Sequence, residues 1–270
     1  MYDLHCHILP AIDDGAKDMK ESVAMLQLAR SSGSDGLVAT PHVIEGKWLP
    51  SWEEIVARCA EVNEAARKNN IELAVYPGAE VGLNWDLLRN ITGPGPYCIN
   101  GGNHMLVELP ALEIPRYTEE FFFALQAKGI TPVVAHPERQ AELIRHPEII
   151  IGWLQKGILI QINGPSLTGR FGQKVKGMAE LLLVHNMVHC IGSDAHGVRS
   201  RKPELFDART RIRALTGEEA MRHLLLDNPQ MILYSKEIPV AEIPVEIKTN
   251  RSRGILGRLT NFVRTRLMVD

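Results

Sequence analysis

Seven short runs of apolar and β-branched residues recur along the chain, and segments of helical character separate them. Each run has four to six residues, as is typical of strands buried on both faces of a sheet. Strands that alternate with helices indicate an α/β protein with a parallel sheet. The runs are residues 2–6, 37–40, 72–77, 105–109, 131–135, 157–162 and 188–192.

The intervening segments carry signals for the ends of helices. Ser51 and Glu54 have the spacing of a capping box, and apolar residues follow them at helical intervals. Gly33 is placed where a preceding helix would end, because glycine favours the left-handed conformation found there. The sequence therefore predicts an α/β fold, with a closed or nearly closed seven-stranded β/α barrel as its leading form.

Histidines and carboxylates follow six of the seven predicted strands. In a β/α barrel the active site lies where the carboxyl ends of the strands meet, so we expect these scattered residues to converge. The period of two along a strand also directs His5 and His7 to one side and Cys6 to the other, which makes Cys6 a core residue. The candidate metal ligands are His5, His7, Asp14, His42, Glu80, Glu108, His136, Asp194 and His196.

Nine ligands are too many for one ion. At about four to six ligands each, and with bridging carboxylates, they suit two or three ions. Nitrogen and oxygen ligands without sulfur favour manganese, iron or zinc. A single histidine at a strand end is more often structural, but the joint pattern of H-x-H, SDAH and the acids between them indicates a metal site.

Composition restricts the classes of function. The apolar content of 45% and formal charge of −2 are ordinary for a globular protein. No apolar run approaches the roughly 18 residues of a membrane span, and the first residues lack the pattern of a signal peptide, so we expect a cytoplasmic protein. The four cysteines form no CxxC pair, and none has an arginine six positions later, which excludes the cysteine-based tyrosine phosphatase loop.

The segments DLHCHILPAIDDGA, ATPH, PGAE, VELP, VVAHPER, QINGPSLTGRFG and SDAH occur in this order. Together they resemble the PHP (polymerase and histidinol phosphatase) superfamily, and more narrowly its manganese-dependent protein-tyrosine phosphatases of bacterial capsule and exopolysaccharide operons. The similarity covers roughly residues 1 to 235, and DDGA, HPER and SLTGRFG are the segments that narrow it.

The resemblance implies a distorted seven-stranded barrel with three Mn²⁺ ions. It assigns His5, His7, Glu80 and Asp194 to one ion, Glu80, Glu108 and His136 to a second, and Asp14, His42 and His196 to a third. It also implies phosphate contacts from Arg139 of HPER and from Arg201, for which Arg199 is an alternative. The implied phosphatase domain is residues 1–236.

The implied substrate is phosphotyrosine in a membrane-associated bacterial tyrosine kinase that regulates polysaccharide export. A histidinol phosphatase of the same superfamily is the alternative, since its metal ligands are much the same. Nucleic acid is an unfavourable partner because the body of the chain is acidic. A non-catalytic metal-binding protein is a further alternative, which an intact ligand set disfavours.

The end of the chain has a different character. Residues 237–254 combine proline and charge without helical period and are predicted to be a linker. Residues 255–270 form a basic, weakly amphipathic tail, and residues 245–270 carry six basic against two acidic side chains. Contact with an anionic membrane is one hypothesis for this tail, and a solvated tail or an oligomer contact are the alternatives.

Overall fold

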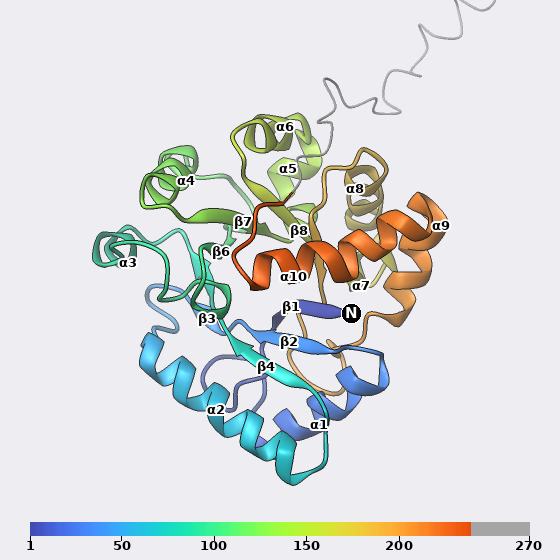
Figure 1. The fold of residues 1–270 in the computed structure, drawn as a ribbon. Helices are drawn as coiled ribbons and strands as arrows, with labels where there is room; N and C mark the ends of the chain where they lie inside the picture. Colours follow the sequence, from blue (N-terminus) through green and yellow to red (C-terminus); the bar gives the residue numbers. More distant parts are fainter. Residues whose placement is uncertain (239–270) are drawn as a thin grey trace, which may run out of the picture.

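A computed structural model of the protein describes residues 1–238, and the chain in this range winds parallel strands and helices around a common centre (Figure 1). Its nine strands are β1 (Tyr2–Cys6), β2 (Gly36–Ala39), β3 (His42–Val43), β4 (Ala74–Pro77), β5 (Glu80–Gly82), β6 (His104–Glu108), β7 (Thr131–Ala135), β8 (Leu159–Asn163) and β9 (Cys190–Gly192). The predicted linker, apart from its first two residues, and the predicted tail lie outside the described range.

The strands form two curled parallel sheets, of order β1-β2-β4 and β3-β5-β6-β7-β8-β9. The sequence predicted seven strands, and each predicted run overlaps one of the observed strands. The two additional short strands arise because Thr40 and Pro41 separate β2 from β3, and Gly78 and Ala79 separate β4 from β5. An isolated parallel bridge joins Cys6 to Ala195, so β1 and the segment after β9 bring the two sheets together.

Helices cover the outer faces of both sheets, and α1 and α2 lie along the outside of the three-stranded sheet (Figure 1). The helices are α1 (Met19–Ser31), α2 (Trp52–Lys68), α3 (Trp85–Asn90), α4 (Thr118–Ala127), α5 (Ala141–Arg145), α6 (Glu148–Gln155), α7 (Gly164–Leu167), α8 (Gln173–Val184), α9 (Phe206–Arg222) and α10 (Asn228–Leu233). Short η turns lie at Ile99–Gly101 and Pro137–Arg139, and a π-helical turn, His223–Asp227, joins α9 to α10. No helix within residues 1–238 is both long and apolar enough to cross a membrane.

The two predicted helix ends are formed by the expected residues. The hydroxyl of Ser51 accepts the backbone N–H of Glu54 at the start of α2. Gly33 follows α1 with φ of 90°, and its N–H reaches the carbonyl of Arg30 while that of Ser34 reaches Ala29. This pair of hydrogen bonds is a Schellman motif, which requires the left-handed residue that glycine supplies without strain.

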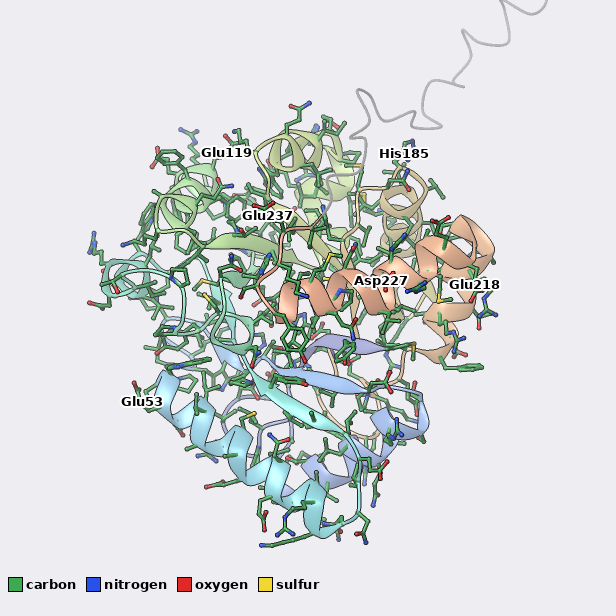
Figure 2. The ribbon with its side chains drawn as sticks, in the orientation of Figure 1. Glu53, Glu119, His185, Glu218, Asp227 and Glu237 are labelled. Carbon is green, nitrogen blue, oxygen red and sulfur yellow. The ribbon has the colours of Figure 1, made fainter. Side chains whose placement is uncertain are left out.

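Two apolar clusters hold the fold together. The larger lies between the strands and the surrounding helices, and it includes Cys6, as predicted. The smaller fills the space enclosed by the strands, where Leu4, Leu106 and Val133 meet Ile232 of α10. Charged side chains such as Glu53, Glu119 and Glu218 lie on the outside of the helices (Figure 2). The small cluster does not extend to the carboxyl ends of the strands, and polar residues lie there.

Candidate metal centre

All nine predicted ligands meet at the carboxyl ends of the strands. They form four overlapping groups, and within each group the potential ligand atoms lie within 4.8 Å of one another. The groups are His7, Asp14, His42 and His196; His5, His7 and Glu80; His5, His136 and Asp194; and His42, Glu80 and Glu108. Convergence of strand ends, expected from the sequence, has therefore produced a compact cluster of imidazole and carboxylate groups.

Glu80 is the centre of this cluster, and its side chain is completely buried. Its Oε2 lies 3.2 Å from Nε2 of His5, 3.3 Å from Nε2 of His7 and 3.0 Å from Nδ1 of His42. Its Oε1 lies 2.9 Å from Nε2 of His136. The short strand β5 fixes this position, because Glu80 pairs in register with His42 of β3. A carboxylate placed between four imidazoles has the position of a bridging ligand.

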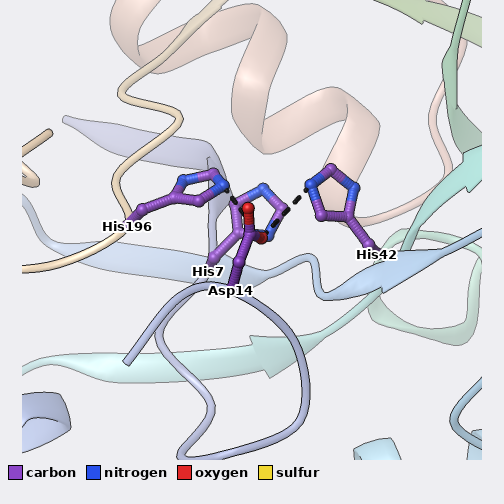
Figure 3. A group of neighbouring side chains, drawn as sticks. All are labelled: His7, Asp14, His42 and His196. Atoms are coloured by element: carbon purple, nitrogen blue, oxygen red, sulfur yellow. Dashed lines mark ion pairs between the residues drawn. The ribbon is translucent and has the colours of Figure 1, made fainter. Parts of the chain in front are cut away.

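Asp14, His42 and His196 form a second focus beside His7 (Figure 3), and about half of the Asp14 side chain is exposed. Oδ1 of Asp14 lies 3.5 Å from Nε2 of His42 and 3.4 Å from Nε2 of His196. The His7 ring stands between the two histidines, with its centroid 3.9 Å from that of His196 and 4.5 Å from that of His42. Asp14, His42 and His196 are the three residues that the resemblance assigns to the third ion.

Two of the predicted ligands have unusual backbone conformations. His136 and Asp194 have φ angles of 33° and 52°, although neither is glycine. Such left-handed residues cost of order 1–3 kcal/mol and persist where the surrounding structure fixes them. At both positions the chain leaves a strand, β7 or β9, and the conformation turns the side chain into the cluster. Local strain is thus concentrated at the site.

Two arginines reach the same carboxylate at the edge of the cluster. Nη1 of Arg139 donates to Oδ2 of Asp194 at 2.6 Å, and Arg201 forms an ion pair with Oδ1 of the same residue. The guanidinium of Arg139 also lies over the ring of Phe171, 4.5 Å from its centroid. About a third of each arginine side chain or less is exposed, so each could contact an incoming anion. Phe171 belongs to the SLTGRFG segment, which explains part of that motif.

The electrostatics of the cluster suit the binding of cations. Burial raises the pKa of Glu80, but the surrounding histidines, His5 first, outweigh this and hold its pKa well below the usual value. The contact with His196 lowers the pKa of Asp14 to about 2. Burial and repulsion from Glu80 raise the pKa of Glu108. The charge on Glu80 opposes ionisation of Glu108, so a cation bound between the two carboxylates would stabilise the ionised form of Glu108.

Buried atoms without hydrogen bonds provide a test of whether a metal fits. Oε2 of Glu80, Nδ1 of His42 and Nε2 of His196 are buried and form no hydrogen bond with acceptable geometry. Leaving such polar atoms unsatisfied is costly, and all three face other ligand atoms of the cluster. The donor set contains nitrogen and oxygen only. The residues therefore fit divalent ions such as manganese, iron or zinc.

Asp13 has a role in the site that the sequence did not reveal. Its Oδ2 accepts Nδ1–H of His7 at 2.7 Å and the backbone N–H of His42 at 3.0 Å. Burial lowers the pKa of His7, but Asp13 and Glu80 outweigh this and raise it to about 10. A carboxylate on Nδ1 fixes the imidazole orientation and leaves Nε2 for a metal. Gly15 permits this packing, since a Cβ there would lie 2.2 Å from the carbonyl oxygen of His7.

Strand β8 supplies orienting residues rather than ligands. Oε1 of Gln161 lies 3.0 Å from Nδ1 of His5, and the amide of Asn163 donates to Oδ2 of Asp194 at 2.7 Å. The buried carboxylate of Glu138 accepts the N–H of Asn163 and the hydroxyl of Ser166. These contacts fix the HPER turn to the QINGPS segment. The predicted strand without a histidine or acid thus also contributes to the site, and its signals were the polar alternation in QIN and its place in the QINGPSLTGRFG segment.

Replacing Asp13 with asparagine tests its orienting role. We expect metal affinity to fall about 10- to 100-fold, as is typical when the outer partner of a histidine ligand is lost. The amide replaces one of the two carboxylate oxygens with a donor, so it cannot preserve all three hydrogen bonds of Asp13. Calorimetric titration with Mn²⁺ measures the affinity directly. Asp207→Asn, an exposed change on α9, is the matched control, and equal affinities for the two variants would contradict this role.

Comparison with known proteins places these observations in a family. The family model described as capsular polysaccharide synthesis, CpsB/CapC, matches residues 1–234. The tyrosine-protein phosphatase YwqE of Bacillus subtilis (strain 168) is 33% identical over 238 residues, which are 88% of this chain and 93% of that protein. The family match therefore spans the whole cluster of expected ligands and both arginines.

Two solved structures have related folds. One belongs to a set of crystal structures of YwqE from Bacillus subtilis and CpsB from Streptococcus pneumoniae, which are described as unique metal-dependent tyrosine phosphatases. It matches this structure with a TM-score of 0.84 and 33% identity, over 91% of this chain and all of that chain. Histidinol phosphate phosphatase from Lactococcus lactis shares the fold, with a TM-score of 0.51 and 14% identity over 80% of this chain and 94% of that one.

Proposed function

The chain belongs to the CpsB/CapC family of capsular polysaccharide synthesis proteins, and from this membership we propose that it is a metal-dependent protein-tyrosine phosphatase. The observation that carries the proposal is the cluster of nine ligands around Glu80 with Arg139 and Arg201 at its edge. The relative YwqE, which is a tyrosine-protein phosphatase by name, supports the same activity. Metals and arginines together are what hydrolysis of a doubly charged phosphate ester requires.

The proposed cofactor is Mn²⁺, in two or three ions. His5, His7, Glu80 and Asp194 would hold one ion, Glu80, Glu108 and His136 a second, and Asp14, His42 and His196 a third. The short contacts of Glu80 with imidazoles of both the first and second sets support its bridging position. When bound, divalent ions lower the pKa of water to near 7 and neutralise the charge of the phosphoryl group.

The protein's own side chains supply orientation and charge. Arg139 is stacked on Phe171 and donates Nη1 to Asp194 at the edge of the site, and its guanidinium would bind two non-bridging oxygens of the phosphoryl group. Arg201 would contact the same group from the other side of Asp194. The tyrosinate leaving group has a pKa of about 10 and departs without obligatory protonation. Asp13 and Gln161 hold the rings of His7 and His5 in place throughout.

Arg201 is the better of the two candidates for the second phosphate contact. Its Nε donates to the backbone carbonyl of Asp194 at 3.1 Å, and its own carbonyl accepts the N–H of His196 at 2.9 Å. The loop containing Arg201 is therefore bound to two ligand residues. Arg199 is exposed and lines a neighbouring pocket instead.

We propose a seven-stranded PHP-type barrel in which β2 and β3 form one interrupted strand and β4 and β5 form another. The strand order is then β1, the combined β2 and β3, the combined β4 and β5, β6, β7, β8 and β9. The bridge between Cys6 and Ala195 pairs β1 with the segment after β9 and closes the ring. This ring supports a closed but distorted barrel. The distortion coincides with His42 and Glu80, which begin the second half of each interrupted strand.

The proposed substrate is a phosphotyrosine protein of the capsule or exopolysaccharide system, a membrane-associated tyrosine kinase, and the proposed place of action is the cytoplasm. The capsule description of the family supports this context. Contact between residues 255–270 and a membrane remains a hypothesis, since those residues lie outside the described range. The buried, unpaired state of Cys6, Cys59, Cys98 and Cys190 agrees with a reducing compartment.

Hydrolysis by the metal-stripped protein tests the function. We expect turnover of a tyrosine-phosphorylated peptide only after Mn²⁺ is added, with parallel additions of Fe²⁺ and Zn²⁺ establishing the preferred ion. His136→Ala should abolish this activity, because it removes an expected ligand whose Nε2 lies 2.9 Å from Glu80. A preference for histidinol phosphate over the peptide would move the protein to the alternative activity, and no metal-dependent turnover of either would overturn the proposal.

A further inference from the structure

A basic pocket adjoins the metal centre and shares one wall with it. It has a volume of about 510 Å³ and lies between the start of α1 and the loop that follows β9. His196, an expected ligand, lines it directly, and Gly197 continues its wall. Nδ1 of His196 lies 3.5 Å from Oδ1 of Asp194, so the pocket is next to the side chains proposed to bind the phosphoryl group. Its cationic members are Lys17, Lys20 and Arg199.

None of these three cations forms an ion pair among the residues that the structure describes. All three side chains are exposed at the pocket. The two acidic residues of the pocket each accept a backbone N–H group and form no ion pair with the three cations. Oδ1 of Asp18 accepts the N–H of Glu21 at the start of α1, and Oε2 of Glu21 accepts the N–H of Lys17. Both carboxylates keep their charge, so three cations face two acids and the pocket lining has a net charge of +1 apart from His196.

We propose that this pocket binds an anionic group of the substrate close in sequence to the phosphotyrosine, either a carboxylate side chain or a second phosphoryl group. The proposal rests on the phosphotyrosine phosphatase activity proposed above and assigns a sequence preference to it. Three cations of like charge around one concave surface are stabilised by an anion between them. The metal centre provides no such selection, because it contacts only the phosphoryl group that every substrate shares.

Peptide kinetics with the full-length, Mn²⁺-loaded protein test this. A set of phosphotyrosine peptides carries one glutamate, or glutamine in its place, at each position within three residues of the phosphotyrosine. We expect glutamate to raise kcat/KM about three- to tenfold at one or more positions, as for two or three partly screened charge contacts. The gain should decline at high salt. Peptides with a second phosphotyrosine at the same position distinguish a phosphoryl from a carboxylate preference.

Charge-removing variants assign the effect to the pocket. Lys17→Gln/Lys20→Gln should reduce the glutamate-to-glutamine ratio to less than about twofold and leave turnover of p-nitrophenyl phosphate unchanged. Arg199→Gln provides a second, independent variant. The control Lys174→Gln/Lys236→Gln removes two exposed lysines that line no part of this pocket and should keep the wild-type ratio.

Two results would overturn the pocket assignment. One is equal kcat/KM for every glutamate and glutamine pair in the wild-type protein. The other is a glutamate-to-glutamine ratio of kcat/KM that stays at the wild-type value in both Lys17→Gln/Lys20→Gln and Arg199→Gln. Failure of the phosphatase proposal itself has a separate signature, since then no phosphotyrosine peptide, neutral or acidic, would be hydrolysed in the presence of metal.

Discussion

Glu80→Gln is expected to lower kcat/KM for a phosphotyrosine peptide by about 10³-fold or more and to reduce the bound metal by at least one ion per chain. Loss of the hydrogen-bond partner of a metal ligand typically lowers metal affinity or activity 10- to 100-fold, and loss of a bridging ligand should lower them further. Glu80 contacts His5, His7, His42 and His136 at 2.9 to 3.3 Å, so a single change affects groups from three other strands. The change keeps the size of the side chain and removes its charge.

Elemental analysis of the purified protein measures the metal, and peptide hydrolysis measures the activity. Glu61→Gln is the matched control, since Glu61 is an exposed residue of α2 outside the cluster. Circular dichroism establishes that both variants are folded. Retention of the full metal content in Glu80→Gln would refute the assignment of Glu80 as a bridging ligand.

Arg139→Lys is expected to lower kcat/KM about 10²-fold while leaving the metal content unchanged. Lysine keeps the positive charge but lacks the planar fork that binds two phosphoryl oxygens, and it cannot reproduce the flat stack on Phe171. The effect should therefore lie in recognition of the phosphoryl group. Competitive inhibition by inorganic phosphate, measured with the same protein, should weaken about tenfold.

The comparison for this variant is Arg145→Lys, an exposed arginine at the end of α5, six residues along the chain. It should change neither turnover nor inhibition by phosphate. An unaltered inhibition constant in Arg139→Lys, together with normal turnover, would show that the guanidinium does not contact the phosphoryl group. A loss of metal would instead indicate that Arg139 acts through Asp194, to which it donates at 2.6 Å.

The class of fold and the clustering of the nine candidate residues could be predicted from the sequence because both depend on local pattern. Each of the seven apolar runs overlaps a strand, and the side chains that follow strands meet at one end of a parallel sheet. The position of Cys6 in the core followed from the period of two along β1. The assignment of ligands to individual ions, by contrast, still rests on resemblance and on the proposals above.

What the sequence could not give was the supporting structure around those ligands. Asp13 and Asp14 are adjacent and chemically alike, yet Asp14 joins His42 and His196 while Asp13 orients His7. Nothing local distinguishes them, because the difference depends on where the loop lies relative to β3 and β9. Gln161 and Asn163 are likewise ordinary polar residues until β8 places them beside His5 and Asp194.

Alternation along a strand also has a limit that only the tertiary structure showed. Leu4 and Cys6 share the same parity, but Leu4 belongs to the inner apolar cluster and Cys6 to the outer one. The register of β1 against β2 shifts between Asp3 and Cys6, and such an irregularity changes which face a side chain occupies. The sequence by itself determined which candidate residues follow the strands, because chemical type and strand period are local properties. Only the tertiary structure decided which of their neighbours orient them, because those contacts join residues as many as 156 positions apart.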